Sequence, residues 1–138
     1  MSCVVSRIID GDTIECVAKI KIRLIGIDAP EKGQKPFGFG AAAALGAIIP
    51  VGSTITLEYD STPLDRYRRV LAYVWYKNVF VNEQIVRSGW GIAEDYPPNI
   101  RHSKRLHVAD STAQAKRVGM WESGKGICRP SDFRRKRC

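Results

Sequence analysis

The sequence predicts a mainly β protein with helices, of the α+β class, in which a small sheet closes into a barrel. Three observations support this. Five short segments have the residue types and alternation of strands, the first three of them follow one another almost without a break, and helical patterns appear only after the third and fifth. The 138 residues are enough for one hydrophobic core and too few for two independent ones.

The strands are predicted from β-branched residues and from alternating apolar and polar side chains. Residues 3–9 form the first, and Asp10-Gly11 favours a hairpin turn into the second, residues 13–18. In residues 19–24 the apolar side chains share one face, and Lys19, Lys21 and Arg23 share the other. The fourth and fifth strands are residues 54–59 and 70–76.

Three helices are predicted between and after the strands. Residues 37–49 form the first, although each of its glycines costs about 1 kcal/mol relative to alanine, so this helix must depend on packing. Asn82 is suited to cap a second helix over residues 82–88, which Gly89 ends, and residues 103–118 form the third. Five strands with one inserted helix and two final ones fit a five-stranded OB-type barrel with three helices.

The net charge of +8 is unevenly distributed. Residues 125–138 contain six Lys and Arg against one Asp, a net charge of +5, which leaves +3 for residues 1–124. The chain therefore divides into a domain, residues 1–124, and a basic C-terminal tail, residues 125–138. This charge predicts a polyanionic partner, nucleic acid before membrane, because no basic amphipathic helix with an aromatic face appears. A tail that only improves solubility is the alternative.

The four cysteines have no CxxC spacing, and His102 and His107 are too far apart for one helical face, so zinc or redox chemistry is not favoured. An even count fits one or two disulfides in an exported protein, and three full pairings remain open. One possibility is a bond from Cys128 or Cys138 to Cys3 or Cys16, which would brace the tail against the barrel. No signal peptide is visible, so we expect either an intracellular protein or one whose leader has been removed.

Carboxylates at strand ends are the first candidates for a functional site. Asp12 shares strand parity with Ile14 and Cys16, so its carboxylate is expected to point inward, where it needs a cation, a donor or a proton. Asp28 and Glu31 flank Pro30 directly after a strand. Together these oxygens suit a hard cation such as calcium. Turn formation and loop solvation are the alternative.

The segment from Asp65 to Arg69 is a basic cluster around one aromatic residue. Its arginines are suited to bidentate contact with phosphate, and Tyr67 offers a stacking face. A solvated loop is the alternative.

These segments together resemble the staphylococcal nuclease (thermonuclease) family. The similarity extends from about Val5 to Trp121. It is carried mainly by Asp10-Gly11-Asp12-Thr13, by the run from Ile22 to Glu31, and by the run from Asp65 to Tyr73. Shorter matches are Val81-Asn82-Glu83, Ala113-Gln114-Ala115 and Gly119-Met120-Trp121.

The resemblance implies an OB barrel with helices and a Ca²⁺-dependent phosphodiesterase. Enzymes of this family act on DNA and RNA, cut the 5′ P–O bond and leave 3′-phosphate ends. Matched by motif, the implied calcium ligands are Asp12, Asp28 and the carbonyl of Ala29, and Glu31 is implied to activate or orient the attacking water. Arg23 and Arg69 are implied to hold the scissile phosphate. The implied nucleotide contacts are Arg66, Tyr67 and Tyr96.

Three departures from the family pattern affect these expectations. Ala29 replaces a Thr, which leaves the carbonyl in place. Arg68 replaces the usual Gly, at a position where an unusual backbone angle would make the placement of Arg69 uncertain. A second pocket tyrosine has no match near Glu94-Asp95.

The function expected from the sequence is thus a calcium-dependent endonuclease of low sequence specificity, acting as a monomer without a membrane partner. The alternative is a non-catalytic OB-fold module that binds nucleic acid or protein, although such degenerate domains usually lose the carboxylates or arginines that are all present here. We expect a secreted or periplasmic enzyme, because a non-specific nuclease endangers its own cell. A cytoplasmic enzyme encoded by a phage or plasmid is the alternative.

Overall fold

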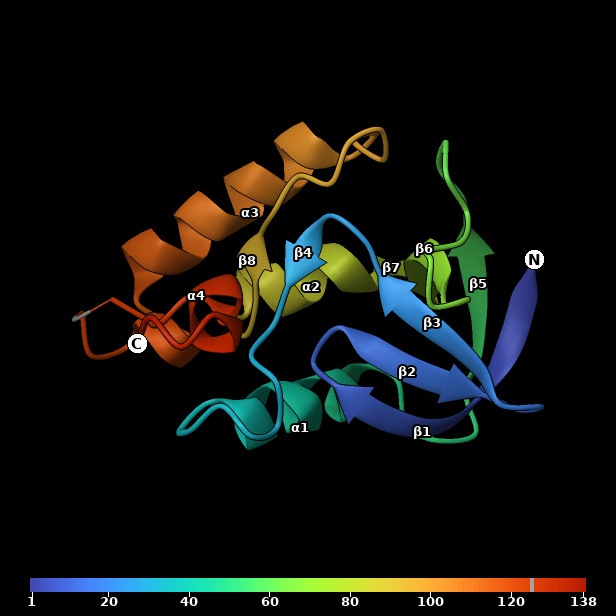
Figure 1. Ribbon diagram of the computed structural model, residues 1–138, viewed down its shortest axis with the longest axis horizontal. Helices are drawn as coiled ribbons and strands as arrows, with labels where there is room; N and C mark the ends of the chain where they lie inside the picture. Colours follow the sequence, from blue (N-terminus) through green and yellow to red (C-terminus); the bar gives the residue numbers. More distant parts are fainter. Residues whose placement is uncertain (125) are drawn as a thin grey trace.

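The computed structural model describes residues 1–124 and 126–138, and five of its strands close into a barrel (Figure 1). Strands β1, β2 and β3 form an antiparallel meander, β5 and β6 continue the sheet from β1, and β3 pairs with β6 in parallel to close it. The barrel strands are β1 (Ser2–Asp10), β2 (Thr13–Cys16), β3 (Ile20–Leu24), β5 (Thr54–Glu58) and β6 (Val70–Tyr76). The predicted five-stranded OB-type barrel is confirmed.

Three further strands have only two residues each. The strand β7 (Val79–Phe80) extends the sheet beside β6, and β4 (Ile27–Asp28) pairs with β8 (Ile92–Ala93) outside the barrel. Two residues are too few to show alternation, so the sequence pattern did not reveal them. The β4–β8 pair is important because it fixes the backbone of Asp28.

The three predicted helices are present, with ends that differ by at most two residues. They are α1 (Gly38–Ile48), α2 (Val81–Arg87) and α3 (Ser103–Lys116). Figure 1 shows α1 and α3 on opposite sides of the molecule, with α2 between the barrel and α3. A 3-10 helix, η1 (Gly119–Trp121), and a short helix, α4 (Pro130–Arg134), were not predicted. Among the described residues, no helix is both long and apolar enough to cross a membrane.

Two local predictions were wrong. The second strand ends at Cys16, because Ala18 and Lys19 take positive φ values of 71° and 60° in the turn to β3. Asn82 is not a helix cap. Its buried side chain accepts a hydrogen bond from the Val74 N–H (2.9 Å) and donates one to the Ile25 carbonyl (2.8 Å), which ties α2 to the barrel.

The glycines of α1 allow neighbouring segments to approach it closely. A Cβ at Gly38 would lie 1.9 Å from the carbonyl oxygen of Glu31, and one at Gly40 would lie 2.5 Å from the Trp90 ring. The helix thus depends on packing, as expected. Its close contact with the Glu31 backbone holds the loop that contains Glu31 beside the barrel.

The core fills the barrel and continues under α2 and α3. The barrel strands contribute alternating side chains, and Leu106 and Ala109 of α3 belong to the same buried cluster. The largest fully buried barrel side chains are Tyr73, Ile14, Ile22, Leu24, Ile55 and Val5.

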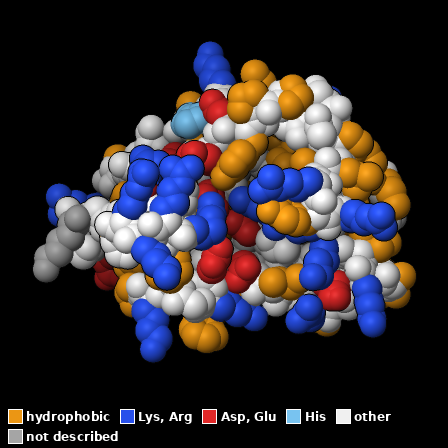
Figure 2. All heavy atoms as spheres, viewed as in Figure 1, with side chains coloured by type: hydrophobic (Ala, Val, Ile, Leu, Met, Phe, Trp, Pro, Cys, Tyr) orange, Lys and Arg blue, Asp and Glu red, His pale blue; other side chains and the backbone are white. Residues whose placement is uncertain are grey.

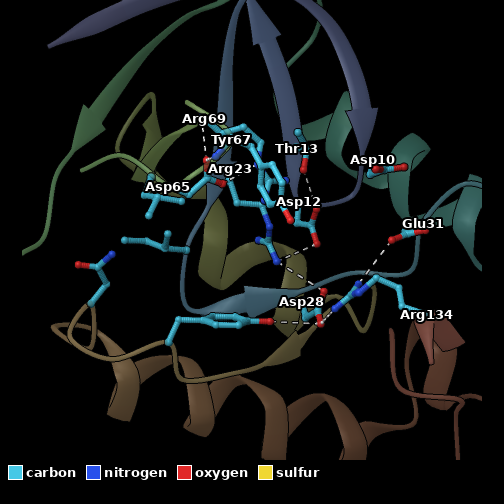
Figure 3. A pocket seen from close by; sticks show the side chains of 14 residues that line it. Asp10, Asp12, Thr13, Arg23, Asp28, Glu31, Asp65, Tyr67, Arg69 and Arg134 are labelled. Atoms are coloured by element: carbon cyan, nitrogen blue, oxygen red, sulfur yellow. Dashed lines mark hydrogen bonds and ion pairs between the residues drawn. The ribbon is translucent and has the colours of Figure 1, made fainter. Parts of the chain in front are cut away.

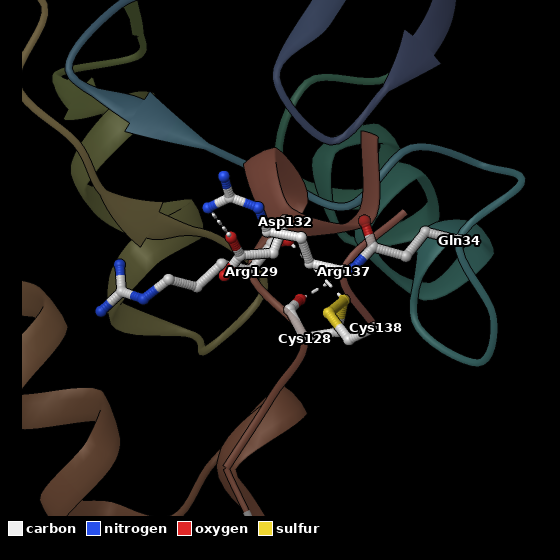
Figure 4. Close-up of a disulfide and its surroundings, with 6 residues drawn as sticks. All are labelled: Gln34, Cys128, Arg129, Asp132, Arg137 and Cys138. Atoms are coloured by element: carbon white, nitrogen blue, oxygen red, sulfur yellow. Dashed lines mark hydrogen bonds and ion pairs between the residues drawn. A yellow bond between two sulfur atoms is a disulfide. The ribbon is translucent and has the colours of Figure 1, made fainter. Parts of the chain in front are cut away.

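The four cysteines form two disulfides, each local in the sequence. Cys3 and Cys16 join β1 to β2, and Cys128 and Cys138 close the C-terminal segment on itself (Figure 4). The possible disulfide between tail and barrel is therefore not formed. The segment is held instead by burial of Pro130 and by the Gln34 side-chain amide, which donates to the Cys128 carbonyl (2.8 Å).

Candidate active site

A cavity of about 470 Å³ opens between one end of the barrel, the loop of residues 60–69 and the C-terminal segment (Figure 3). Figure 2 shows acidic side chains gathered in the middle of this face and bordered by Lys and Arg. The predicted site residues that line the cavity are Asp12, Arg23, Asp28, Glu31, Tyr67, Arg69 and Tyr96. The other two, Ala29 and Arg66, are described by the structure but are not part of the lining.

Asp12 lies in the two-residue turn between β1 and β2, not within the strand from which its direction was inferred. Asp12 is nevertheless only 6% exposed. One carboxylate oxygen accepts from the Thr13 hydroxyl (2.9 Å), and the other accepts from the Ala29 N–H (2.8 Å). The turn and the segment after β4 therefore hold one another in place.

Asp28 is 1% exposed, and groups of opposite effect surround it. Burial raises the pKa of its carboxyl, the guanidinium of Arg23 lowers it, and the charge of Asp12 raises it again. Its Oδ1 lies 3.5 Å from Nη2 of Arg23, while Oδ2 accepts from the Tyr96 hydroxyl (3.4 Å) and from Nη2 of Arg134 (3.1 Å). Additional positive charge at this position would stabilise the ionised carboxylate.

Arg23 forms ion pairs with both aspartates. In β3 it pairs with Thr13 on one side and Leu71 on the other, so the closed barrel fixes its backbone. Its Nη2 lies 3.4 Å from Asp12 and 3.5 Å from Asp28, and Nη1 donates to the Leu24 carbonyl. Its side chain is 12% exposed, so these ion pairs are well shielded from solvent.

The donor set fits a hard divalent cation. Two buried carboxylates from separate elements converge on one nitrogen atom, and oxygen donors of this kind are those that calcium prefers. The backbone of Ala29 lies beside them, since its N–H binds Asp12. Within residues 1–124 and 126–138, no three His, Cys, Asp or Glu side chains form a metal cluster, so carbonyls and water would complete the coordination.

Glu31 lies at the edge of the cavity and is more exposed than the aspartates. Its carbonyl accepts from the Gln34 N–H (2.8 Å), and the backbone of α1 packs against it at Gly38. Its carboxylate lies 3.6 Å from Nη1 of Arg134. The half-exposed side chain can thus still contact water, while its backbone is held.

Arg69 enters the cavity from the opposite side and is held by Asp65. Both its N–H (2.9 Å) and its Nε (2.7 Å) donate to that carboxylate. Burial alone would raise the pKa of Asp65, but these hydrogen bonds from Arg69 lower it overall. Arg68 has the unusual backbone angle that the sequence suggested, with a φ of 64°, and Arg69 still lines the cavity.

The aromatic residues lie at the mouth of the site. Tyr67 is exposed, with the guanidinium carbons of Arg66 and Arg69 at 5.0 and 5.8 Å from its ring centroid. Burial, followed by the charge of Asp28, raises the pKa of Tyr96 to about 12, so its hydroxyl stays protonated and donates to Asp28.

Comparison with known proteins identifies the family. A family model described as staphylococcal nuclease homologue matches residues 21–123. The chain belongs to this family. It is 35% identical to a thermonuclease of Staphylococcus intermedius over 129 residues, covering 88% of this chain and 76% of that protein. It is 34% identical to a thermonuclease of Staphylococcus hyicus (86% and 75% covered) and 36% identical to an uncharacterized endonuclease of Haemophilus influenzae (97% and 73% covered).

Several cavity residues of this family member had no predicted role, among them Thr13, Asn99 and Arg134. Thr13 holds Asp12, and Asn99 exchanges two hydrogen bonds with the backbone of Thr62, which ties the 60–69 loop to the segment after Tyr96. Arg134 comes from beyond the family match. The basic run around Arg134 gives no indication of where its side chains lie, because such runs are usually solvated, and it was expected in a separate tail.

Proposed function

We propose that this nuclease is a Ca²⁺-dependent endonuclease that hydrolyses DNA and RNA with low sequence specificity, cutting the 5′ P–O bond to leave 3′-phosphate ends. One observation carries the proposal: two buried aspartates converge on Arg23 in a cavity that Arg69 also lines. Family membership supports the nuclease activity, and the chemistry of these donors supports the calcium dependence.

In this proposal, Asp12, Asp28 and the Ala29 carbonyl would hold the calcium ion. When bound, the ion would supply a Lewis acid that polarises the phosphate. Glu31, at the solvent edge of the cavity, would accept the proton of the attacking water or orient that water. Its held backbone and half-exposed carboxylate suit this task.

Arg23 and Arg69 would contact the phosphate oxygens. Negative charge grows on these oxygens in the transition state, and planar guanidinium groups offer them paired N–H donors. The carboxylates of Asp28 and Asp65 aim the two groups in advance, so little reorganisation is needed when the charge develops.

Low sequence specificity follows from the kind of contact that the cavity offers. Guanidinium groups bind phosphates, which are the same at every position, and the exposed ring of Tyr67 can stack on any base. Arg66 and Tyr96 would contact the nucleotide beside the Tyr67 ring.

The deciding experiment is cleavage of plasmid DNA, heat-denatured DNA and RNA in Ca²⁺, with and without a calcium chelator. We expect cleavage of all three that the chelator abolishes. Fragments should accept a 5′ label from polynucleotide kinase without phosphatase treatment, because their 5′ ends would carry hydroxyls. Binding without cleavage would instead indicate the non-catalytic module.

The metal assignment is tested with Asp28→Ala. We expect the variant to lose calorimetric Ca²⁺ binding and activity together. Glu122→Ala is the matched control, because it removes an exposed carboxylate that is not among the cavity residues. Unchanged calcium affinity in Asp28→Ala would refute this ligand set.

We further propose that the enzyme acts as a monomer in an oxidising compartment, secreted or periplasmic. Two disulfides support this location, since such bonds persist mainly outside the cytoplasm. A cytoplasmic enzyme encoded by a phage or plasmid is the alternative, and free thiols in protein isolated from its native cells would favour it.

A further inference from the structure

The C-terminal segment, residues 126–138, brings a third arginine to the candidate active site. Nη2 of Arg134 donates to Asp28 Oδ2 at 3.1 Å, and Nη1 lies 3.6 Å from Glu31 Oε1. Figure 3 shows this guanidinium between the two carboxylates. One side chain therefore joins a proposed calcium ligand to the proposed water-activating residue.

The segment that carries Arg134 is built to hold it there. Pro130 is buried and begins α4, and the disulfide between Cys128 and Cys138 closes the chain around this helix. The amide of Gln34, itself 3% exposed, donates to the Cys128 carbonyl at the start of the loop (Figure 4). Arg134 is thus placed from both ends of its segment.

We propose that Arg134 is a positioning residue of this site, which holds Asp28 and Glu31 and competes with a divalent cation for Asp28. The inference rests on the proposed function, because it assumes that the ion binds at Asp12 and Asp28. It adds a residue outside the family match to the determinants of ion affinity.

The geometry shows why the two groups compete. Arg23 lies against Oδ1 of Asp28 and Arg134 against Oδ2, so both carboxylate oxygens already face a positive charge. Calcium binds oxygens at about 2.3–2.6 Å and would be repelled by both guanidiniums at this range. Of the two guanidiniums, that of Arg134 is expected to move away from Asp28 when the cation binds. Its side chain is 42% exposed against 12% for Arg23, and it lies on a separate segment instead of a barrel strand.

The test is calorimetric Ca²⁺ binding to the full-length protein and its variants. Arg134→Gln should bind Ca²⁺ about fivefold more tightly than the wild type, the scale of partly exposed ion pairs that no longer have to be broken. The difference should shrink as ionic strength rises, since salt already weakens these pairs. Arg134→Lys keeps the charge and should stay near the wild type.

Two further variants separate this role from a general effect of charge or folding. Arg135→Gln makes the same change one residue later, where the described residues show no ion pair, and should leave Ca²⁺ affinity unchanged. The double variant Cys128→Ser, Cys138→Ser should shift affinity in the same direction as Arg134→Gln, because the segment that presents Arg134 is no longer closed.

Equal or weaker Ca²⁺ binding by Arg134→Gln would overturn the inference and leave the proposed function intact. Absence of Ca²⁺ binding in wild type and variant alike would overturn the proposed calcium site, and the inference with it. An equal gain in Arg135→Gln would show that net charge alone is responsible, which also overturns it.

Discussion

Two of the walls that border the cavity, the barrel end and the 60–69 loop, are built in different ways. The barrel wall consists of two buried aspartates, Asp12 and Asp28, and of Arg23, which is mostly covered and pairs with both of them. The loop wall consists of Asp65, Tyr67 and Arg69, which are more exposed and depend on the single carboxylate of Asp65. The barrel wall is therefore fixed by the fold itself, whereas the loop wall is fixed by local hydrogen bonds.

Closure of the barrel brings the walls together. Arg23 lies between Thr13 and Leu71 in the ladder, and Arg69 immediately precedes β6, which β3 joins in parallel. A change in the barrel wall should therefore disturb chemistry most, and a change in the loop wall should first disturb the placement of one arginine.

The largest effect should come from Arg23→Lys. Lysine keeps the charge but loses the planar guanidinium that is proposed to hold the phosphate, and we expect kcat to fall by about 10²–10³-fold, as when one preorganised donor is removed. Arg69→Lys should cost less, because its side chain is more exposed and held by fewer groups. Steady-state kinetics on one DNA substrate compares them directly.

Thermal unfolding of both lysine variants serves as the control, since a kinetic loss counts only if the fold is retained. A wild-type kcat in Arg23→Lys would remove Arg23 from the proposed phosphate clamp. A larger loss in Arg69→Lys would reverse the comparison between the walls.

The barrel wall was also the wall that the sequence predicted better. Alternation in residues 19–24 placed Arg23 on the polar face of its strand. The carboxylates of Asp12 and Asp28 were candidates because they lie at strand ends. Even so, Asp12 is buried because of its turn and not because of strand parity. The β4–β8 pair that holds Asp28 could not be predicted from the sequence, because two-residue strands are too short to show alternation.

Long-range placement was what the sequence could not supply. The buried amide of Asn82 binds groups near residues 25 and 74, a role that a helix-cap pattern does not distinguish. Arg134 contacts Asp28 across 106 positions of chain, and nothing in a run of basic residues specifies such a contact. Local patterns thus gave elements and candidate residues, while tertiary contacts decided which of them meet.

A smaller effect is expected from Asp65→Asn in the loop wall. The pKa of Asp65 is lowered in the folded protein because, although burial opposes it, hydrogen bonds from Arg69 favour the ionised form. Stabilisation from such a group is present above its unfolded pKa and is lost as pH falls through the lower folded value. At pH 7 the variant should lose about 1–2 kcal/mol of unfolding free energy, the scale of hydrogen bonds to a charged group.

The pH dependence makes this prediction specific. Denaturant titrations at neutral and acidic pH should show the wild type losing stability below about pH 4, with the gap to Asp65→Asn closing there. A gap that stays constant across this range would mean that the charge of Asp65 does not hold the loop wall.

The smallest effect should come from Arg68→Gly, which tests whether the loop wall is strained. Arg68 has a φ of 64°, a region that costs a residue with a Cβ about 1–2 kcal/mol, and its side chain is exposed. Glycine removes that cost but gains freedom in the unfolded chain, so the unfolding free energy should rise by about 0.5–1 kcal/mol. Arg66→Gly is the matched control, since Arg66 lies in the same loop and is not among the positive-φ residues of the described chain, and it should lower stability.

The same variant should leave catalysis nearly unchanged. Because Arg69 is held by Asp65 and not by Arg68, kcat of Arg68→Gly should stay within about twofold of the wild type. Denaturant unfolding measures the unfolding free energy, and steady-state kinetics measures kcat. A stability gain with a large fall in kcat would show that the strained angle itself aims Arg69, and that the loop wall is less independent of its backbone than its hydrogen bonds suggest.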